Sequence, residues 1–127
     1  RRHTRYISVT GVQTCALPIC KVRHGDTQVD IEVPPIEVQG REIVLIDDVA
    51  STARTLVNAA RQLLARGAAS IDVAVTHALF AGDADAVLHA AGVRHVWSTD
   101  SIVHASNAIA LAPLLGEAVA GVQAGVA

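Results

Sequence analysis

Short segments rich in β-branched residues alternate along the chain with longer segments of helical periodicity. Strands are predicted at residues 43–46, 71–75 and 93–97. The first of these runs is apolar throughout, so we expect it to be buried on both faces of a sheet. Residues 29–33 alternate apolar and polar side chains, which predicts a half-buried strand that ends at residues 34–35, both proline.

Helices are predicted between and after these strands. Apolar residues at helical spacing follow the first run from about Ser51, and Gly67 is expected to end that helix. A second helix is predicted between Gly82 and Gly92, and a third over residues 111–119. Because strands and helices alternate, the predicted fold class is α/β, with a doubly wound, mostly parallel sheet flanked by helices.

The junction between the apolar strand and the first helix carries the main candidate chemistry. Asp47 and Asp48 follow the apolar run, and a short run of small and hydroxyl residues leads into the helix. Two carboxylates can accept hydrogen bonds from vicinal ribose hydroxyls, and small residues let the backbone N–H groups of a helix N-terminus converge on a phosphate. The arrangement predicts a sugar-phosphate site. The alternative is an ordinary strand-to-helix turn in which the acids cap the helix.

This junction resembles the phosphoribosyl diphosphate (PRPP) binding motif of proteins with the type I phosphoribosyltransferase fold. Asp47 and Asp48 match the acidic pair of that motif, and Thr52 and Thr55 match its threonines. Ala53 replaces the usual glycine, which bears on how tightly the loop closes on phosphate. The ribose-phosphate-binding residues that the resemblance implies are Asp47, Asp48, Ser51, Thr52, Ala53, Arg54 and Thr55.

The surrounding sequence resembles the ribose-phosphate pyrophosphokinase family over residues 21–115. The matching positions are Lys21 and Arg23 before the motif, residues 76–77 (Thr-His) after the next strand, and residues 99–101 (Thr-Asp-Ser) after the one following. The matching region is the last, C-terminal part of these enzymes, which transfer diphosphate from ATP to ribose 5-phosphate and so make PRPP.

The resemblance implies roles that the pattern alone does not. Lys21 and Arg23 become the catalytic residues, on a mobile loop whose cations stabilise phosphoryl charge in the transition state. Without the resemblance, the segment that contains Lys21 and Arg23 is interpreted as a solvated, charged loop. Mg²⁺ is implied as a cofactor bound mainly through the substrate phosphates, with no protein metal site. We also expect a cytoplasmic protein that forms a homo-oligomer at full length.

Polar residues also end two other predicted strands. Ligands bind beyond the carboxyl ends of parallel strands, so we expect Thr76, His77 and residues 99–101 to converge with the acidic pair in one crevice. The alternative is structural: Thr76 and His77 satisfy backbone groups, and Asp100 and Ser101 cap the next segment. The histidines without ligand spacing, to which no metal is assigned, are His24, His89, His95 and His104.

Residues 1–20 are not included in the predicted fold. Residues 9–19 look like a translated sequencing-library adapter, so we expect a non-native, disordered leader before a phosphoribosyltransferase-like domain over residues 21–127. Both cysteines, Cys15 and Cys20, lie in this leader, so no disulfide framework is expected. A net charge of −2 and the lack of a long apolar run argue against a nucleic-acid or membrane partner.

Two other functions remain open at this point. A phosphoribosyltransferase that consumes PRPP would use the same ribose-phosphate site, but it needs a separate hood over the base that the sequence does not reveal. A non-catalytic, synthetase-associated regulatory module would keep the fold and bind the ligand without turnover. Dependence of the activity on ATP separates all three.

Overall fold

The computed structural model describes residues 20–24, 28–32 and 35–124, which fall into two compact units, residues 1–36 and 37–127. The first unit contains a hairpin in which β1 (Cys20–His24) pairs with β2 (Gln28–Glu32) in antiparallel register. The expected leader lies outside the described residues, except for Cys20, which begins β1.

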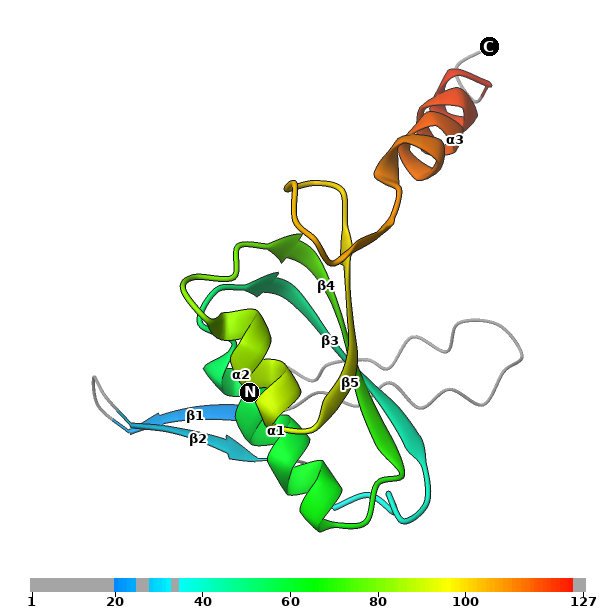
Figure 1. Ribbon diagram of the computed structural model, residues 1–127. Coiled ribbons are helices and arrows are strands. Elements are labelled where there is room, and N and C mark those ends of the chain that lie inside the picture. The colour runs from blue at the N-terminus through cyan, green and yellow to red at the C-terminus, as the bar shows by residue number, and fades with distance from the viewer. Residues whose placement is uncertain (1–19, 25–27, 33–34, 125–127) are drawn as a thin grey trace. The chain divides into compact units, whose positions relative to one another are not determined.

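The second unit is a parallel sheet of order β3-β4-β5-β6 (Figure 1). Its elements in chain order are β3 (Glu42–Ala50), α1 (Arg54–Ala65), β4 (Ser70–Ala78), α2 (Ala84–Ala90), β5 (Val93–Thr99), β6 (Asn107–Ile109) and α3 (Leu111–Ala124). The predicted α/β class, with a parallel sheet and flanking helices, is confirmed. None of the helices in the described ranges is long and apolar enough to cross a membrane.

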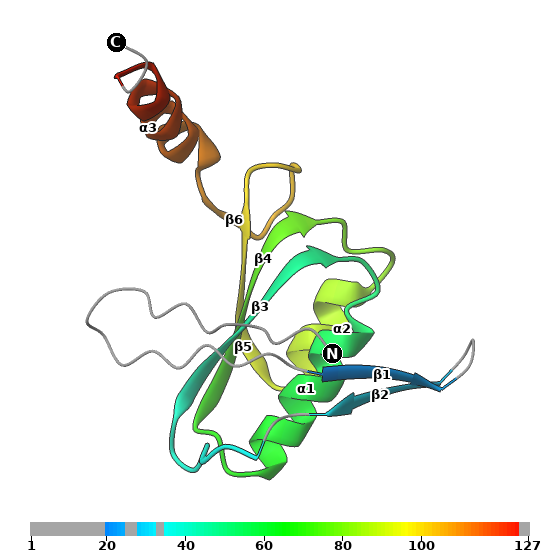
Figure 2. The ribbon, with the colours of Figure 1, turned by 180° about the vertical axis from the view of Figure 1, so that it is seen from behind.

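Helices α1 and α2 lie side by side on one face of the sheet (Figures 1 and 2). Each connects neighbouring parallel strands, and right-handed crossovers in a sheet that grows in one direction place their helices on the same face. The core forms between these helices and the strands beneath them. Its best-buried members are Ala59, Ala60, Leu63, Ile71, Val73 and Leu88.

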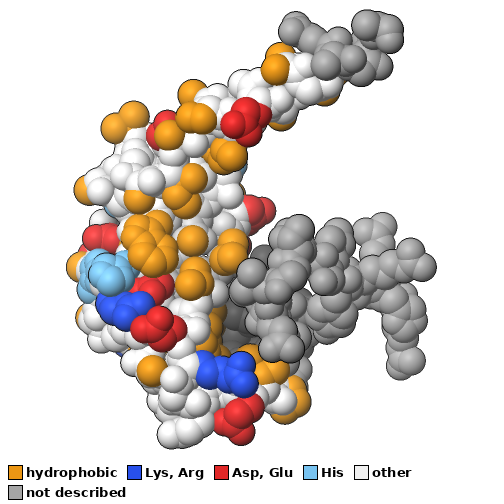
Figure 3. All heavy atoms as spheres, turned by 90° about the vertical axis from the view of Figure 1, so that its right-hand side faces the viewer, with side chains coloured by type: hydrophobic (Ala, Val, Ile, Leu, Met, Phe, Trp, Pro, Cys, Tyr) orange, Lys and Arg blue, Asp and Glu red, His pale blue; other side chains and the backbone are white. Residues whose placement is uncertain are grey.

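The prediction that residues 43–46 are buried on both faces is wrong for the described part of the chain. Leu45 is 5% exposed beneath the helices, whereas Val44 and Ile46 are 48% and 81% exposed. Successive side chains of a strand point to opposite faces, and α1 and α2 cover only one of them. Figure 3 shows hydrophobic side chains gathered at the surface of the molecule.

The strands are longer than the sequence predicts. β3 continues through Ala50, so Asp47 and Asp48 lie within the strand and do not follow it. β4 likewise includes Thr76 and His77, and β5 extends to Thr99. Hydrogen bonding to a neighbouring strand, which periodicity does not report, holds these polar residues in extended conformation.

Candidate functional site

Two adjacent carboxylates lie near the carboxyl end of β3. Asp47 is half-buried and Asp48 is exposed. The Oδ1 atom of Asp47 accepts a hydrogen bond from the backbone N–H of Asp48 at 3.0 Å, and that of Asp48 accepts one from the N–H of Val49 at 2.7 Å. Because the strand alternates, the two side chains leave β3 from opposite faces, with Asp47 on the face that carries the helices.

The connection from β3 to α1 is short and tightly turned. Ser51 and Thr52 are exposed, and Ala53 is buried with φ of 55°, in the left-handed region. Ala53 is the only non-glycine residue with positive φ among the described residues. α1 begins directly afterwards at Arg54, so the sequence places the turn, the hydroxyl residues and the helix N-terminus within five positions.

The N-terminus of α1 is uncapped. The N-cap residue is Ala53, no side chain among the described residues makes a capping hydrogen bond, and the first turn contains no acidic residue. The alternative in which the acids cap this helix is therefore wrong. The first-turn N–H groups and the positive end of the helix dipole are left for another acceptor, and Arg54 adds a further positive charge there. This arrangement suits an anion.

The segment after β4 supports this loop. The N–H of Phe80 donates to the carbonyl of Ala50 at 2.9 Å, and the N–H of Ala81 donates to the carbonyl of Ser51 at 3.0 Å. The ring of Phe80 also packs against His104, with ring centroids 4.9 Å apart. The loop after β3 is therefore fixed by backbone hydrogen bonds to the loop after β4, which in turn contacts the loop after β5.

The carboxyl ends of β4 and β5 are joined by a compact polar cluster. The hydroxyls of Thr99 and Ser101 lie 2.6 and 2.8 Å from the carbonyl oxygen of Thr76. The Nδ1 atom of His77 lies 2.9 Å from the Oγ atom of Ser101. The expected convergence of these two strand ends is thus confirmed, and the structural alternative holds as well, because Thr99 and Ser101 satisfy a backbone carbonyl.

Asp100 and Asn107 have structural positions beside this cluster. The Oδ1 atom of Asp100 accepts a hydrogen bond from the N–H of Leu111 at 2.9 Å, so Asp100 caps α3 as the structural alternative predicts. The side-chain amide of Asn107 contacts the hydroxyl of Ser98 and the carbonyls of Thr99 and Ile102 at 2.6 to 3.0 Å. Asn107 was not predicted, because nothing in its local sequence distinguishes it from an ordinary loop residue.

Lys21 and Arg23 lie in a regular hairpin strand. Both are in β1, where they pair with Ile31 and Val29 of β2. They belong to the first compact unit, and the loop after β3 belongs to the second. Their proposed role therefore rests on the resemblance.

The described residues contain no group of three or more His, Cys, Asp or Glu side chains that could hold a metal ion. Asp47 and Asp48 supply only two neighbouring carboxylates. This donor set fits Mg²⁺ that is held mainly by substrate phosphates and water, and it does not fit a cage made of protein ligands alone.

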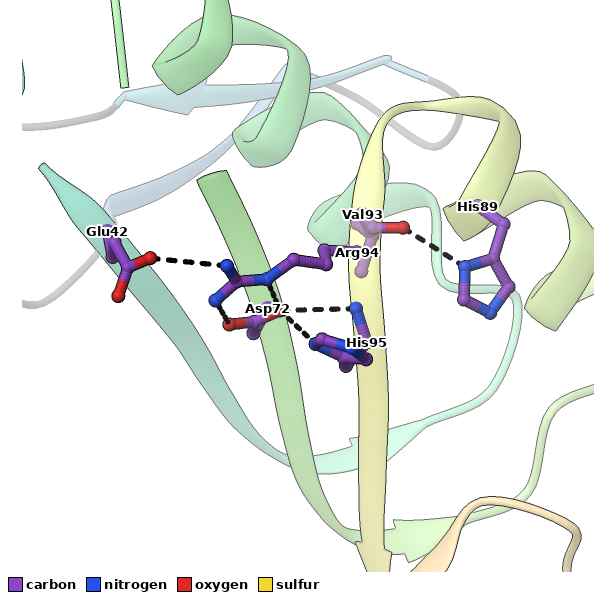
Figure 4. A network of polar contacts seen from close by, with 6 residues as sticks. All are labelled: Glu42, Asp72, His89, Val93, Arg94 and His95. Carbon is purple, nitrogen blue, oxygen red and sulfur yellow. Dashed lines mark hydrogen bonds and ion pairs between the residues drawn. The ribbon is translucent and has the colours of Figure 1, made fainter. Parts of the chain in front are cut away.

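A second polar network lies at the opposite, amino end of the strands (Figure 4). Asp72 of β4 is 3% exposed, and its carboxylate accepts hydrogen bonds from the Nε and Nη2 atoms of Arg94 at 3.1 and 2.7 Å. The N–H of His95 donates to the same carboxylate at 3.1 Å, and Glu42 contacts the far side of the Arg94 guanidinium at 3.2 Å. Arg94 thus bridges β3 and β4 from β5.

The charges of this network stabilise one another. The hydrogen bonds from Arg94 hold the pKa of Asp72 below its ordinary value, against the opposing effect of burial. The Asp72 carboxylate in turn raises the pKa of Arg94. The network spans the point where the register between β4 and β5 shifts, and the imidazole of His95 stacks on Trp97 with ring centroids 5.6 Å apart. Its location far along the strands from the loop indicates a structural role.

Comparison with known proteins gives consistent matches. A family model described as phosphoribosyl synthetase-associated domain matches residues 15–119. Ribose-phosphate pyrophosphokinase 2 of Archaeoglobus fulgidus is 38% identical over 97 residues, which are 76% of this chain and 36% of that protein. Ribose-phosphate pyrophosphokinase of Methanopyrus kandleri is 36% identical over 112 residues, 88% of this chain and 38% of that protein.

A solved structure has a similar fold. Phosphoribosylpyrophosphate synthetase from Mycobacterium smegmatis superimposes with a TM-score of 0.57 at 24% sequence identity, over 80% of this chain and 36% of that one. The chain therefore spans about a third of the length of the relatives it matches.

Proposed function

The chain belongs to the phosphoribosyl synthetase-associated domain family, and from this membership we propose that it forms the ribose-phosphate-binding part of a ribose-phosphate pyrophosphokinase. The reaction is the transfer of diphosphate from ATP to ribose 5-phosphate, which gives AMP and the PRPP used in nucleotide biosynthesis. Within such an enzyme, this chain corresponds to the C-terminal part.

The observation that carries this proposal is the uncapped N-terminus of α1. An ordinary helix start has a capping side chain or an acid in its first turn, whereas this one has Ala53 in a left-handed conformation and Arg54 at the first position. A bound phosphate would accept hydrogen bonds from the free N–H groups. It would also offset the positive end of the helix dipole and the charge of Arg54. We assign Ser51, Thr52, Ala53, Arg54 and Thr55 to the 5-phosphate.

The acidic pair completes the sugar site in this proposal. Asp47 and Asp48 accept hydrogen bonds from ribose hydroxyls, and the sugar lies across the end of β3 because the two carboxylates leave opposite faces of that strand. Charged hydrogen bonds of this kind contribute about 1.5–3 kcal/mol each. They select a hydroxylated sugar over free phosphate.

Diphosphate transfer needs cations in addition to this site. We propose that Lys21, which is the only lysine in the chain, and Arg23 stabilise the negative charge that develops on the transferred group. Mg²⁺ held by the substrate phosphates would neutralise further charge when bound. The adenine site and the subunit contacts of a cytoplasmic homo-oligomer are assigned to the part of the relatives' length that this chain does not match.

Asp48→Asn tests the proposed site. Loss of one charged hydrogen bond should weaken binding of ribose 5-phosphate by about tenfold or more, measured by calorimetry on the full chain. Asp83→Asn is the matched control, because Asp83 is an exposed aspartate that caps no helix with its side chain. Equal affinity of the Asp48 variant and the unaltered chain would remove Asp48 from the site.

A further inference from the structure

His77 lies one strand away from the proposed ribose site. It pairs with Val49 across the parallel β3–β4 ladder, and paired residues of neighbouring strands point to the same face of a sheet. Asp47, two residues before Val49, leaves β3 from that face as well. The His77 imidazole and the Asp47 carboxylate are therefore diagonal neighbours at the carboxyl end of the sheet, where ligands of parallel sheets bind.

The hydrogen bonds around His77 determine which nitrogen of its neutral ring carries the proton. A carbonyl oxygen only accepts, so the hydroxyls of Thr99 and Ser101, at 2.6 and 2.8 Å from the carbonyl of Thr76, both donate to it. The single hydroxyl proton of Ser101 is then used. The contact of 2.9 Å between Ser101 Oγ and His77 Nδ1 requires the imidazole to donate. Neutral His77 is thus protonated on Nδ1, and its Nε2 atom is an acceptor.

The Nε2 atom accepts no hydrogen bond from the described part of the chain. The only hydrogen bond of the His77 ring there is the one to Ser101. The two ring nitrogens direct their hydrogen bonds to different sides of the ring, so Nε2 does not face Ser101. His77 is also only partly buried, which leaves Nε2 open to a ligand. An oriented ring whose free atom accepts is suited to a hydroxyl.

We propose that Nε2 of His77 accepts a hydrogen bond from the anomeric hydroxyl of the bound sugar phosphate. This inference rests on the proposed function. Ribose 5-phosphate in its ring form has three free hydroxyls, and the two carboxylates of β3 account for the vicinal pair at C2 and C3. The third, at C1, is the hydroxyl that attacks diphosphate. An acceptor at this position orients its oxygen toward the diphosphate donor.

The test compares two ligands that differ only at C1. Calorimetry measures binding of ribose 5-phosphate and of 1,4-anhydro-D-ribitol 5-phosphate, which lacks the anomeric hydroxyl, to the full chain. The unaltered chain should prefer ribose 5-phosphate by about fivefold, as expected for one neutral hydrogen bond. His77→Ala should abolish this preference by weakening only ribose 5-phosphate. His77→Gln, which keeps an acceptor, should restore part of it.

His89→Ala is the control, because the His89 ring binds the carbonyl of Val93 at the amino end of β5, opposite the proposed site, and should leave both affinities unchanged. Equal binding of the two ligands to the unaltered chain would overturn the inference. An equal loss of both ligands in the His77 variants would also overturn it, because the residue would then act only on the fold. If neither ligand binds the unaltered chain, the proposed function itself fails, and the inference fails with it.

Discussion

A single methyl group decides how closely the loop after β3 can approach a phosphate. Ala53 has φ of 55°, a conformation that costs an L-residue about 1–2 kcal/mol. Glycine would avoid that cost, but it loses about 0.5–1 kcal/mol to its greater freedom in the unfolded chain. It also gives up a buried methyl worth about 0.8 kcal/mol. These effects nearly cancel in stability, whereas binding depends only on the approach of the backbone.

Ala53→Gly should therefore change the free energy of unfolding by less than about 1 kcal/mol, and it should tighten ribose 5-phosphate binding several-fold. Ala53→Val is the contrasting variant. A β-branched side chain at this φ is a strained outlier in a buried position, and we expect a loss of about 1–3 kcal/mol. Urea unfolding and calorimetry measure the two effects. Weaker binding by the glycine variant would contradict the proposed approach of the loop to phosphate.

Asp72 shows a different use of charge at the residue scale. Its carboxylate is almost fully buried, yet it has partners on both sides, from Arg94 and from the backbone of His95. Burying a carboxylate is unfavourable unless it is paired and hydrogen-bonded. Because the Arg94 side chain is 44% exposed, solvent screens part of this attraction, and the pair contributes less than a fully buried one would.

Asp72→Asn should cost about 2 kcal/mol of unfolding free energy at pH 7. The folded pKa of Asp72 lies below its ordinary value of 3.8, so its contribution is complete above that pH and is lost as pH falls through the folded pKa. The stabilities of the variant and the unaltered chain should therefore begin to converge as the pH falls below about 4. Urea unfolding from pH 7 to pH 2 measures this. A constant difference over that range would contradict the ionised pair.

At the scale of elements, the local spacing of apolar residues correctly predicted the helices, whose formation depends mainly on residues close in sequence. α1 was predicted from the spacing of four apolar residues, of which Leu56, Ala60 and Leu63 are buried and Leu64 is only partly buried. The C-terminal stop at Gly67 was also correct, since Gly67 has φ of 90° just after the helix. The strand ends were placed too early, because each apolar run is followed by polar residues that the strand includes and that are held by neighbours distant in sequence.

The candidate site was predicted only in part for the same reason. The order of strand, acids, hydroxyl residues and helix is local, and it located the loop after β3 correctly on the chain. The bond between His77 and Ser101 joins residues 24 positions apart, and the bond between Asp72 and Arg94 joins residues 22 apart. β6 is three residues long and was missed. The pattern of apolar and polar residues within a segment does not predict contacts with residues that are distant in sequence.

The helices differ in how much they contribute to stability. Leu63 of α1 is 2% exposed, whereas Leu114 of α3 is 57% exposed. Leu63→Ala should therefore cost about 2–5 kcal/mol, and Leu114→Ala should change the free energy of unfolding by less than about 0.5 kcal/mol. Urea unfolding of both variants is a matched comparison, because the chemical change is the same. A loss above about 1 kcal/mol at Leu114 would show that this face of α3 is covered in solution.

At the scale of the whole molecule, the two ends of the sheet have different roles, one in stability and one in the proposed binding of ligand. Its amino end contains the charge network of Glu42, Asp72 and Arg94, which joins three strands. Its carboxyl end presents the proposed sugar-phosphate loop, stabilised by backbone hydrogen bonds from residues 80–81. Changes to the network should therefore act on stability, and changes to the loop should act on binding. This is the division that the variants of Asp72 and Asp48 measure.

Binding and turnover should also separate at this scale. The chain matches 38% of the length of its Methanopyrus kandleri relative, and we assign the adenine site to the remainder. Transfer needs both substrates held in line, and that positioning provides much of the rate enhancement. We therefore expect the chain to bind ribose 5-phosphate but to release little AMP when ATP and Mg²⁺ are added. Brisk AMP release by the chain alone would contradict this assignment.

The chain joined to the unmatched part of that relative should be active, and there Lys21 can be tested. Its cation acts on charge that develops in the transition state, so Lys21→Ala should lower kcat by about 100-fold or more while the KM for ribose 5-phosphate changes little. Arg41→Ala is the control, because Arg41 is an exposed cation just before β3 and should leave both constants unchanged. AMP release measures each rate. Full activity of the Lys21 variant would remove this lysine from the mechanism, whereas no AMP release by the unaltered joined protein would favour a protein that binds the sugar phosphate without turning it over.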